Sequence, residues 1–520
     1  MAQLLYPIGI QTFSKIREAG FVYVDKTEYI HRLVSTSQYV FLSRPRRFGK
    51  SLLLSTIESY FQGRRELFEG LAISNYQQDW TPCPVLYLDF TGTNYDSPDS
   101  LKIHLNHFLT GWERQFGIEK QDQSIGLRFK RVLEEAHAKT GERVVLLIDE
   151  YDKALLETVD RRDLQEQYRS DLRAFYSNLK SQDLHIRFAM LTGVTKFGHL
   201  SIFSDLNNLQ DISLDEQYSG ICGVTTDELH QYFHPGVEEL ARDWEITTDE
   251  AYGKLKQSYD GYHFSAKRRE DVYNPFSLLN CLSKRMFGDY WFKTGTPTFL
   301  IKMIRDMGLP LQDLSQHQTY LTSLTDVSFD LGDPIPVLYQ SGYLTIKDFD
   351  PEFKTVTLGF PNTEVENGFF NQLLPFYTSL KSNSAFEITR FVKDAREGRA
   401  EDFMQRMQSL FADFQYDAFD LRRLEQHYQD VLFILVKLMG LYTRIEYRTA
   451  SGRIDMVIMT PGYIYVMEFK LDRTAEEALA QIDSKGYMLP FRADGRRFIK
   501  IGANFSTQLR GIDSWIIEEE

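Results

Sequence analysis

The amino-acid sequence predicts an α/β protein with a parallel-sheet domain near its start and a second, smaller α/β domain near its end. Two observations favour the first domain. An apolar strand at Tyr39–Leu42 runs into a basic loop and then a helix, and another apolar strand at Val144–Ile148 ends in an acidic pair. An unbroken apolar run is typical of a central parallel strand that is covered on both faces. The second domain is indicated by charged side chains inside apolar strands between residues 454 and 470.

The bulk properties are those of an ordinary globular protein that is too long for a single core. The chain has 520 residues, of which 42% are hydrophobic and 25% are charged, and this length corresponds to roughly three to four domains. Three widely spaced cysteines give no metal-binding spacing and favour a reducing compartment. No apolar stretch approaches the ~20 residues that span a bilayer, and the N-terminus lacks a signal-peptide pattern. We therefore expect a cytoplasmic protein with no membrane partner.

The basic loop after Tyr39–Leu42 has the order of elements that a phosphate-binding loop requires. Strand, loop, Gly49-Lys50-Ser51 and an apolar helix follow one another, so backbone N–H groups at the helix start can face phosphates. The lysine then reaches the β- and γ-phosphate oxygens, and the serine hydroxyl binds Mg²⁺. The predicted nucleotide-binding residues of this segment are Arg46, Arg47, Phe48, Gly49, Lys50, Ser51 and Leu52.

Arg44 departs from the general phosphate-loop pattern. It stands where the G-x-x-x-x-G-K-[ST] motif has its first glycine, and a bulky residue disfavours the positive φ that glycine adopts readily. Either the loop follows a different path at Arg44, or the segment is a basic turn that caps an ordinary helix.

The acidic pair Asp149-Glu150 directly follows the apolar run, as expected at the end of a central strand in a nucleotide hydrolase. Asp149 would hold Mg²⁺ together with Ser51, and Glu150 would polarise the attacking water. The alternative for a single motif is a strand that ends in a solvated turn. The phosphate-loop pattern about 100 residues earlier favours a P-loop NTPase core with a RecA/ASCE-like parallel sheet.

A further apolar strand, Ile186–Leu191, ends in a polar segment. Thr192 is the best-placed residue to sense the γ-phosphate, with Thr195 and Lys196 behind it. A strand end followed by a glycine turn is the alternative. We expect the core to span residues 1–212, a helical lid or winged-helix-like region residues 213–330, and a connecting region residues 331–409. In the latter, Val337–Tyr339 has strand character, as does Val22–Thr27 in the core.

A second constellation of charged residues lies in the predicted domain at residues 410–520. Asp455 is in one apolar strand, and Glu468 and Lys470 are two residues apart in the next, so their side chains share a face. Antiparallel pairing across the intervening turn would bring the two carboxylates within metal-ligand distance. Glu425, on a preceding helix, adds a third carboxylate, and Gln481, on a following helix, can support the water.

These residue types suit hydrolysis of a phosphodiester bond. Carboxylates bind Mg²⁺, which activates water and stabilises the leaving oxygen, and Lys470 can orient the water or hold the phosphate. A surface ion pair between Glu468 and Lys470 is the alternative, but it leaves Asp455 in its apolar strand unexplained. The net charge of −14 argues against a protein that coats DNA by bulk electrostatics, whereas a nuclease gains local positive charge from its metal.

The motifs resemble two known families. Residues 1 to about 330 are similar to the AAA-ATPase-like family, through R-P-R-R-F-G-K-S at Arg44–Ser51, I-D-E-Y-D at Ile148–Asp152 and T-G-V-T-K-F at Thr192–Phe197. The region from about 410 to 515 resembles the PD-(D/E)xK nuclease superfamily, through G-R-I-D at Gly452–Asp455 and E-F-K at Glu468–Lys470. The resemblance implies that Arg44 is a family trait and that the second domain has a restriction-endonuclease-like α/β fold.

The combined hypothesis is an ATP- and Mg²⁺-dependent protein in which the nucleotide state controls a C-terminal nuclease. DNA is favoured over RNA as the substrate, and the resemblance implies a setting in mobile-element biology or defence against foreign DNA. A homo-oligomer would be required if Arg46 or Arg47 reached a neighbour's nucleotide. The rivals are a nucleotide-dependent switch whose nuclease-like domain only binds nucleic acid or a partner protein, and a remodelling ATPase with a passive docking domain.

Overall fold

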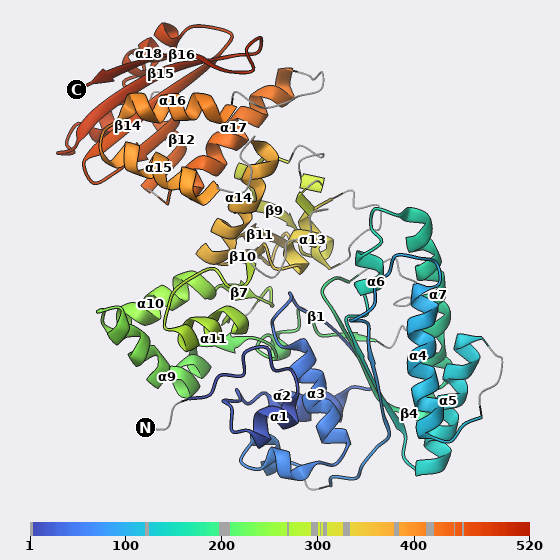
Figure 1. Cartoon of the computed structure of the whole chain (residues 1–520). Coiled ribbons are helices and arrows are strands. Elements are labelled where there is room, and N and C mark those ends of the chain that lie inside the picture. Colours follow the sequence, from blue (N-terminus) through green and yellow to red (C-terminus); the bar gives the residue numbers. More distant parts are fainter. Residues whose placement is uncertain are drawn as a thin grey trace. The chain divides into compact units, whose positions relative to one another are not determined.

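The structure is a computed structural model and divides into two compact units. It describes residues 4–77, 79–119, 124–196, 209–267, 270–292, 300–301, 303–304, 309–325, 333–378, 384–411, 421–440, 442–449 and 452–520. The N-terminal unit comprises Met1–Gly295 and Gln316–Val365, and the C-terminal unit comprises Thr296–Ser315 and Glu366–Glu520. Figure 1 shows the elements, coloured along the chain from blue to red.

A five-stranded sheet forms the centre of the N-terminal unit. Its spatial order is β2 (Val85–Asp89), β3 (Val144–Asp149), β4 (Ile186–Gly193), β1 (Tyr39–Ser43) and β5 (Gln210–Asp211), and all neighbours are parallel. The parallel α/β sheet predicted from the sequence is confirmed. Because parallel strands end at the same edge, β1, β3 and β4 bring the phosphate loop, the acidic pair and Thr192 together.

Helices cover both faces of this sheet. In Figure 1, α4, α5 and α7 lie on one side, and α1, α2 and α3 lie on the other. Asp25 accepts hydrogen bonds from the backbone of Thr27 (2.8 Å) and Ala72 (2.7 Å), so residues 21–26 form an irregular segment, and the strand predicted over Val22–Thr27 is wrong. The helices are α1 (Phe13–Glu18), α2 (Thr27–Thr36), α3 (Lys50–Phe61), α4 (Ser100–Gln115), α5 (Ile125–Thr140), α6 (Lys153–Leu156) and α7 (Arg162–Ser181).

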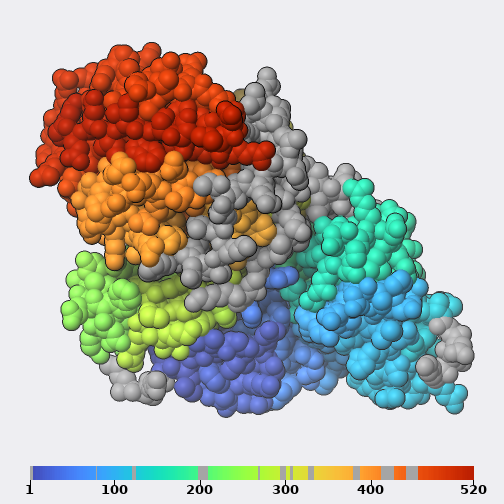
Figure 2. All heavy atoms as spheres, turned by 45° about the horizontal axis from the view of Figure 1, so that its top comes forward, coloured from blue at the N-terminus to red at the C-terminus, as the bar shows by residue number. Residues whose placement is uncertain are grey.

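An appendage of helices and a small antiparallel sheet follows the core. It contains β6 (Val224–Thr225), α9 (Thr226–Asp243), α10 (Thr248–Tyr259), β7 (Tyr262–His263), β8 (Asp271–Tyr273) and α11 (Pro275–Lys284), with the strand order β6-β8-β7. Lys26 and Glu228 form a buried ion pair at 2.5 Å that ties α9 to the start of the chain. In Figure 2 the appendage, in green, lies beside the first part of the chain, in dark blue. The composition agrees with the predicted helical or winged-helix-like region.

The remaining elements of the N-terminal unit are a three-stranded sheet and a short helix. The sheet has the order β10 (Thr345–Asp350), β11 (Thr355–Gly359) and β9 (His317–Tyr320). The helix α13 (Ile335–Gln340) contains Val337–Tyr339, so the strand predicted there is wrong. Prolines in its first turn and Asp333, which accepts from the Ile335 N–H at 2.9 Å, favour a helix start.

The C-terminal unit is a mixed sheet with helices. The strand order is β12 (Tyr442–Thr449), β13 (Gly452–Met459), β14 (Tyr463–Leu471), β15 (Arg497–Ser506) and β16 (Gly511–Glu519); only the β14–β15 pair is parallel. A parallel pair needs a crossover, which here contains α18 (Ala475–Ser484). The other helices are α14 (Thr363–Tyr377), α15 (Ser384–Arg396), α16 (Ala400–Phe411) and α17 (Leu421–Leu438).

Candidate functional site

The phosphate loop makes its left-handed turns at two positions after Arg44. Arg47 has φ 71° and Gly49 has φ 94°, whereas Arg44 is not among the residues with positive φ. The glycine of the general pattern is therefore not needed for backbone conformation at position 44. At Arg44 the loop thus follows a path that requires no positive φ.

The Arg44 side chain fastens this loop to the chain after β5. Arg44 is 1% exposed, and its guanidinium donates to the carbonyl oxygens of Ser213 (2.7 Å) and Tyr218 (3.2 Å). It also lies 4.1 Å from the centre of the Phe264 ring, a cation–π contact. Phe48, also buried, packs edge-on against the rings of Tyr262 and Phe264. Arg44 therefore holds the loop against the segment after β5, and Phe48 holds it against the appendage.

Lys50 is held by acceptors that belong to the protein itself. The ammonium group is 4% exposed and donates to the carbonyl oxygens of Arg44 (3.0 Å) and Pro45 (3.3 Å). Its distance to Glu150 Oε1 is 3.6 Å. A buried lysine requires such partners, and a phosphate group can replace them at the same donor.

Asp149, Ser51 and Thr192 come together at the carboxyl edge of the sheet. Thr192 donates to Asp149 Oδ1 at 2.7 Å, and Ser51 also hydrogen-bonds this carboxylate. Burial raises the pKa of Asp149 above its ordinary value, because desolvation disfavours the charged form. Thr195 instead hydrogen-bonds Asp152 at 2.7 Å, and Lys196 pairs with Asp211 at 3.0 Å. Of the three candidates on this segment, Thr192 is the one in contact with Asp149.

A cavity of about 330 Å³ adjoins the phosphate loop. Arg46 and Arg47 are exposed at its wall, and Glu150 contributes from the end of β3. Residues 7–11 and the start of α11, including Phe276, also line the cavity, and the Arg47 guanidinium lies 4.9 Å from the centre of the Phe276 ring. Sequence reasoning missed these two segments, because neither carries a motif and only the tertiary fold brings them to the loop. The cavity lining also includes Gly49, Lys50, Ser51 and Leu52.

The second site lies in the C-terminal unit, where β13 and β14 pair as the sequence predicts. Their antiparallel register places Met456 opposite Met467, so the neighbouring residues Asp455 and Glu468 meet at the end of the ladder. Asp455 Oδ2 accepts a hydrogen bond from the Phe469 N–H at 2.9 Å, which fixes the carboxylate against β14.

Glu468, Lys470 and Gln481 form one hydrogen-bonded network. Lys470 Nζ donates to Glu468 Oε1 at 3.0 Å and to Gln481 Oε1 at 2.6 Å, and Gln481 Nε2 also donates to Glu468 Oε1. Sequence reasoning missed Tyr487, whose hydroxyl lies 3.3 Å from Gln481 Nε2. A tyrosine six residues after Gln481 carries no periodic signal that would single it out.

The donor set at this site fits a divalent cation. Glu468 is 3% exposed, and its Oε2 atom is buried with no hydrogen-bond partner among the residues that the structure describes. Burial, and secondly the negative charge of Asp455, raise the pKa of Glu468 to about 7. A bound cation would satisfy the unpartnered oxygen and offset this repulsion.

The described residues supply two of the three predicted carboxylates. The side chain of Glu425 lies outside the described residues, so this predicted ligand is not placed. Within the described part of the chain, no group of three His, Cys, Asp or Glu side chains has metal-binding geometry. Asp455 and Glu468 would then hold a Mg²⁺ ion whose other ligands are oxygens of water or substrate, the usual arrangement for Mg²⁺.

Comparisons with known proteins match the two regions of the chain that carry these residues. A family model described as a predicted AAA-ATPase matches residues 7–203, and one described as the PD-(D/E)XK nuclease superfamily matches residues 423–515. A protein of Azotobacter chroococcum mcd 1, described as "Uncharacterized protein in vnfD 5'region", is 37% identical over 536 residues and covers 100% of this chain and 99% of its own length.

A solved structure, the Aeropyrum pernix ORC2 protein in ADPNP–ADP complexes, is 12% identical and covers 72% of this chain and 97% of its own. Its TM-score is 0.26. Over the residues that the structure describes, no helix has the length and apolar character of a membrane span.

Proposed function

We propose that this chain, which belongs to the predicted AAA-ATPase family, is a nuclease under nucleotide control. The proposal starts from the PD-(D/E)XK nuclease superfamily domain that the chain also carries. In this proposal the N-terminal unit binds and hydrolyses ATP. The C-terminal unit cleaves phosphodiester bonds in nucleic acid, DNA in preference to RNA, with Mg²⁺. The nucleotide state sets the rate of cleavage.

The N-terminal residues can divide the work of ATP hydrolysis among them. Lys50 would exchange its loop carbonyls for phosphate oxygens, and this exchange would also release Glu150 from its 3.6 Å contact to orient water. Ser51 and Asp149 would hold Mg²⁺ on the nucleotide, and Thr192 keeps Asp149 in position. Arg46 and Arg47 would contact the chain's own nucleotide, because both line the same cavity as Lys50.

The C-terminal residues can perform the second reaction. Asp455 and Glu468 would hold Mg²⁺, which supplies Lewis acidity and a water of lowered pKa when bound. Lys470 lies between Glu468 and Gln481, where its ammonium group can hold the scissile phosphate or orient a water molecule. Gln481 holds both partners at a fixed spacing.

The observation that carries the nuclease proposal is the unpartnered Glu468 Oε2. Buried polar atoms in folded proteins nearly always have a partner, and an exception requires an explanation. A structural ion pair with Lys470 explains only the Oε1 atom, since Lys470 donates to that oxygen. A metal ligand explains the Oε2 atom as well.

One chain of contacts supports control by the nucleotide. The Trp291 indole N–H donates to the Arg46 carbonyl oxygen at 3.0 Å, and the Trp291 backbone N–H donates to Glu364 at 2.8 Å. Glu364 is in the first turn of α14, and the division between the two units falls within this helix, after Val365. A change in the phosphate loop can therefore act on the helix that continues into the C-terminal unit.

The test is Mg²⁺-dependent cleavage by the wild-type protein and Lys470→Ala, with single- and double-stranded DNA and RNA. Lys393→Ala, an exposed lysine on α15, is the matched control. We expect the control to cleave like wild type and Lys470→Ala to lose cleavage by roughly a hundredfold or more, as for other positioned catalytic groups. Equal cleavage by Lys470→Ala and wild type would contradict the proposal. Binding without cleavage of any substrate would favour the nucleotide-dependent switch.

A further inference from the structure

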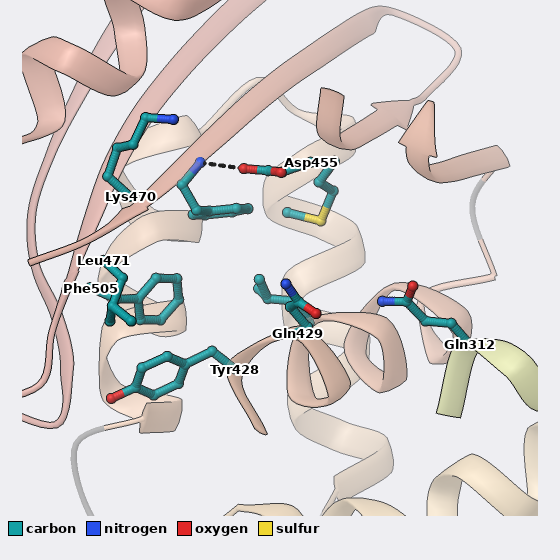
Figure 3. Close-up of a pocket in the computed structure, with 10 residues that line it drawn as sticks. Gln312, Tyr428, Gln429, Asp455, Lys470, Leu471 and Phe505 are labelled. Carbon is teal, nitrogen blue, oxygen red and sulfur yellow. Dashed lines mark hydrogen bonds between the residues drawn. The ribbon is translucent and has the colours of Figure 1, made fainter. Parts of the chain in front are cut away.

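A cavity in the C-terminal unit borders Asp455, one of the two carboxylates, and is lined mostly by residues outside the network of Glu468, Lys470 and Gln481. It has a volume of about 130 Å³, and Asp455 and Lys470 form part of its wall. Figure 3 shows these two residues at one end and Tyr428, Gln429 and Gln312 at the other. The cavity is therefore placed for a group that is attached to the bound phosphodiester.

One wall of this cavity is aromatic. Phe469 is half-buried and lies 5.6 Å from Phe505, whose ring stacks on Tyr428 at 4.4 Å. The Phe469 N–H also holds the Asp455 carboxylate. The same residue thus fixes a predicted metal ligand and presents a ring to the cavity. Stacking on aromatic rings is the usual way in which proteins bind unpaired bases of any sequence.

The opposite wall carries amide groups. Gln429 projects from α17 and Gln312 from the 3₁₀ turn Leu311–Ser315, and Figure 3 shows their amide ends directed toward each other. The turn is fixed to α17 because the Leu311 N–H donates to Asp430 at 3.2 Å. An amide presents both a donor and an acceptor, which match the hydrogen-bonding edge of a base.

The volume limits what can enter. A cavity of about 150 Å³ holds a single benzene ring, whereas pockets for drug-sized ligands are roughly 300–1,000 Å³. At about 130 Å³, this cavity is similar in size to one planar ring and much smaller than a base pair. A base can reach it only after leaving the helical stack, which costs least in a single strand.

We propose that this cavity binds an unpaired nucleobase next to the scissile phosphate, and that single-stranded nucleic acid is therefore the substrate. Phe469 stacks on the base, and Gln429 and Gln312 hydrogen-bond its edge. This inference rests on the proposed nuclease function, because it names the substrate of the same site.

Binding without cleavage tests the proposal directly. The full-length protein is titrated in Ca²⁺ onto fluorescent oligonucleotides: a single strand, the matching duplex, and a set of single strands with one abasic site each. We expect the single strand to bind at least tenfold more tightly than the duplex. We also expect one abasic position, or a short cluster, to weaken binding on the order of tenfold, the usual effect of losing one stacked base.

Two variants connect this effect to the cavity. Phe469→Leu keeps the apolar volume but removes the ring, and Gln429→Ala changes an exposed side chain that folding does not require. Both variants should weaken single-strand binding about tenfold and leave duplex binding unchanged. The abasic position that weakens binding by the wild type should not further weaken binding by Phe469→Leu. Gln508→Ala, an exposed glutamine between β15 and β16, should bind like wild type.

The outcomes separate this inference from the proposed function. Equal affinity for single strand and duplex, an abasic scan without a sensitive position, or equal weakening of both substrates by the variants would overturn the inference. If cleavage in Mg²⁺ is absent while abasic-sensitive binding persists, the nuclease proposal fails and the binding site stands. If the wild type cleaves duplex and single strand equally and the scan is flat, only the inference fails.

Discussion

At the scale of single residues, each candidate site holds the ammonium group of a lysine with acceptors from the chain itself, buried at Lys50 and partly buried at Lys470. Lys50 donates to loop carbonyls and lies beside Glu150, and Lys470 donates to Glu468 and Gln481. Both arrangements avoid the cost of an unpaired buried charge. They also place each ammonium group where a phosphate oxygen can replace a weaker partner.

The Asp455–Glu468 pair predicts opposite effects on stability and metal binding. Two neighbouring carboxylates repel when no cation is bound, so Asp455→Asn should raise the free energy of unfolding of the metal-free protein by about 1 kcal/mol. The same change should abolish the rise in Tm that Mg²⁺ gives to the wild type. Thermal unfolding with and without Mg²⁺ measures both. An Asp455→Asn protein that is less stable, yet still stabilised by Mg²⁺, would contradict this assignment.

At the scale of elements, the phosphate loop depends on a residue that its motif does not contain. Arg44 joins the end of β1 to the segment after β5, and Phe48 packs on the aromatic cluster of the appendage. The exposed Arg46 and Arg47 between them are left to face the cavity. Anchoring by Arg44 and Phe48 and the proposed nucleotide binding by Arg46 and Arg47 are thus divided between different residues of the loop.

This division predicts that restoring the general motif is harmful. Arg44→Gly removes buried hydrogen bonds and leaves a cavity, so it should lower the free energy of unfolding by about 3 kcal/mol. It should also weaken ATP binding. Arg47→Gly is the matched control, because glycine suits the φ of 71° at this exposed position and should leave stability equal or slightly higher. Denaturant unfolding of the two variants measures these changes in the free energy of unfolding. An Arg44→Gly protein as stable as wild type would refute the anchoring role.

The first turn of α14 predicts a pH dependence of stability. Burial raises the pKa of Glu364 from 4.5 to about 7. Between these two pH values, Glu364 is protonated in the folded protein but ionised in the unfolded chain. This contribution to stability therefore falls as the pH rises from about 4.5 to 7 and is constant above that. Glu364→Gln keeps an acceptor for Trp291 without the charge. It should be more stable than wild type by roughly 3 kcal/mol at pH 8 and about equal at pH 4.5.

Unfolding midpoints of wild type and Glu364→Gln across this pH range provide the measurement. Parallel curves for the two proteins, with no gap that opens toward pH 8, would show that Glu364 stays ionised when folded. Because Glu364 also accepts from Trp291, a loss of stability at every pH would instead mean that its hydrogen bonds need the carboxylate.

Local pattern was sufficient for some elements and not for others. The apolar runs of β1 and β3, and the helix that begins at Lys50, follow directly from sequence. Val337–Tyr339 has an apolar composition that suits either state, and proline and Asp333 at the helix start decided for the helix. The register of β13 and β14 was predictable because a short turn fixes it.

The sites were predictable only where a motif carries the chemistry. Sequence indicated Asp455, Glu468, Lys470 and Gln481, which the structure brings together. It could not indicate residues 7–11 at the nucleotide cavity, or Gln312 beside Gln429, because these contacts depend on tertiary folding between distant segments. Such residues line a cavity without any spacing that marks them in the chain.

At the scale of the whole molecule, two chemical sites lie on two units that share one helix. The cavity proposed for the nucleotide belongs entirely to the N-terminal unit and the carboxylate pair to the C-terminal unit. Control of one by the other requires an element whose state both can bias. The contacts from Arg46 through Trp291 to Glu364 make α14 the candidate.

Trp291→Phe, which keeps the ring and removes the indole donor, should reduce the effect of ATP on cleavage while leaving ATP affinity within a few-fold.

The most direct test of nucleotide control is the rate of Mg²⁺-dependent cleavage without nucleotide, with ADP and with ATP, in wild type and Lys50→Ala. We predict that the wild-type rate changes by about tenfold or more between ADP and ATP, and that Lys50→Ala keeps a basal rate that no nucleotide alters. A wild-type rate that is the same in all three conditions, or a Lys50→Ala protein with the full response to ATP, would contradict the account.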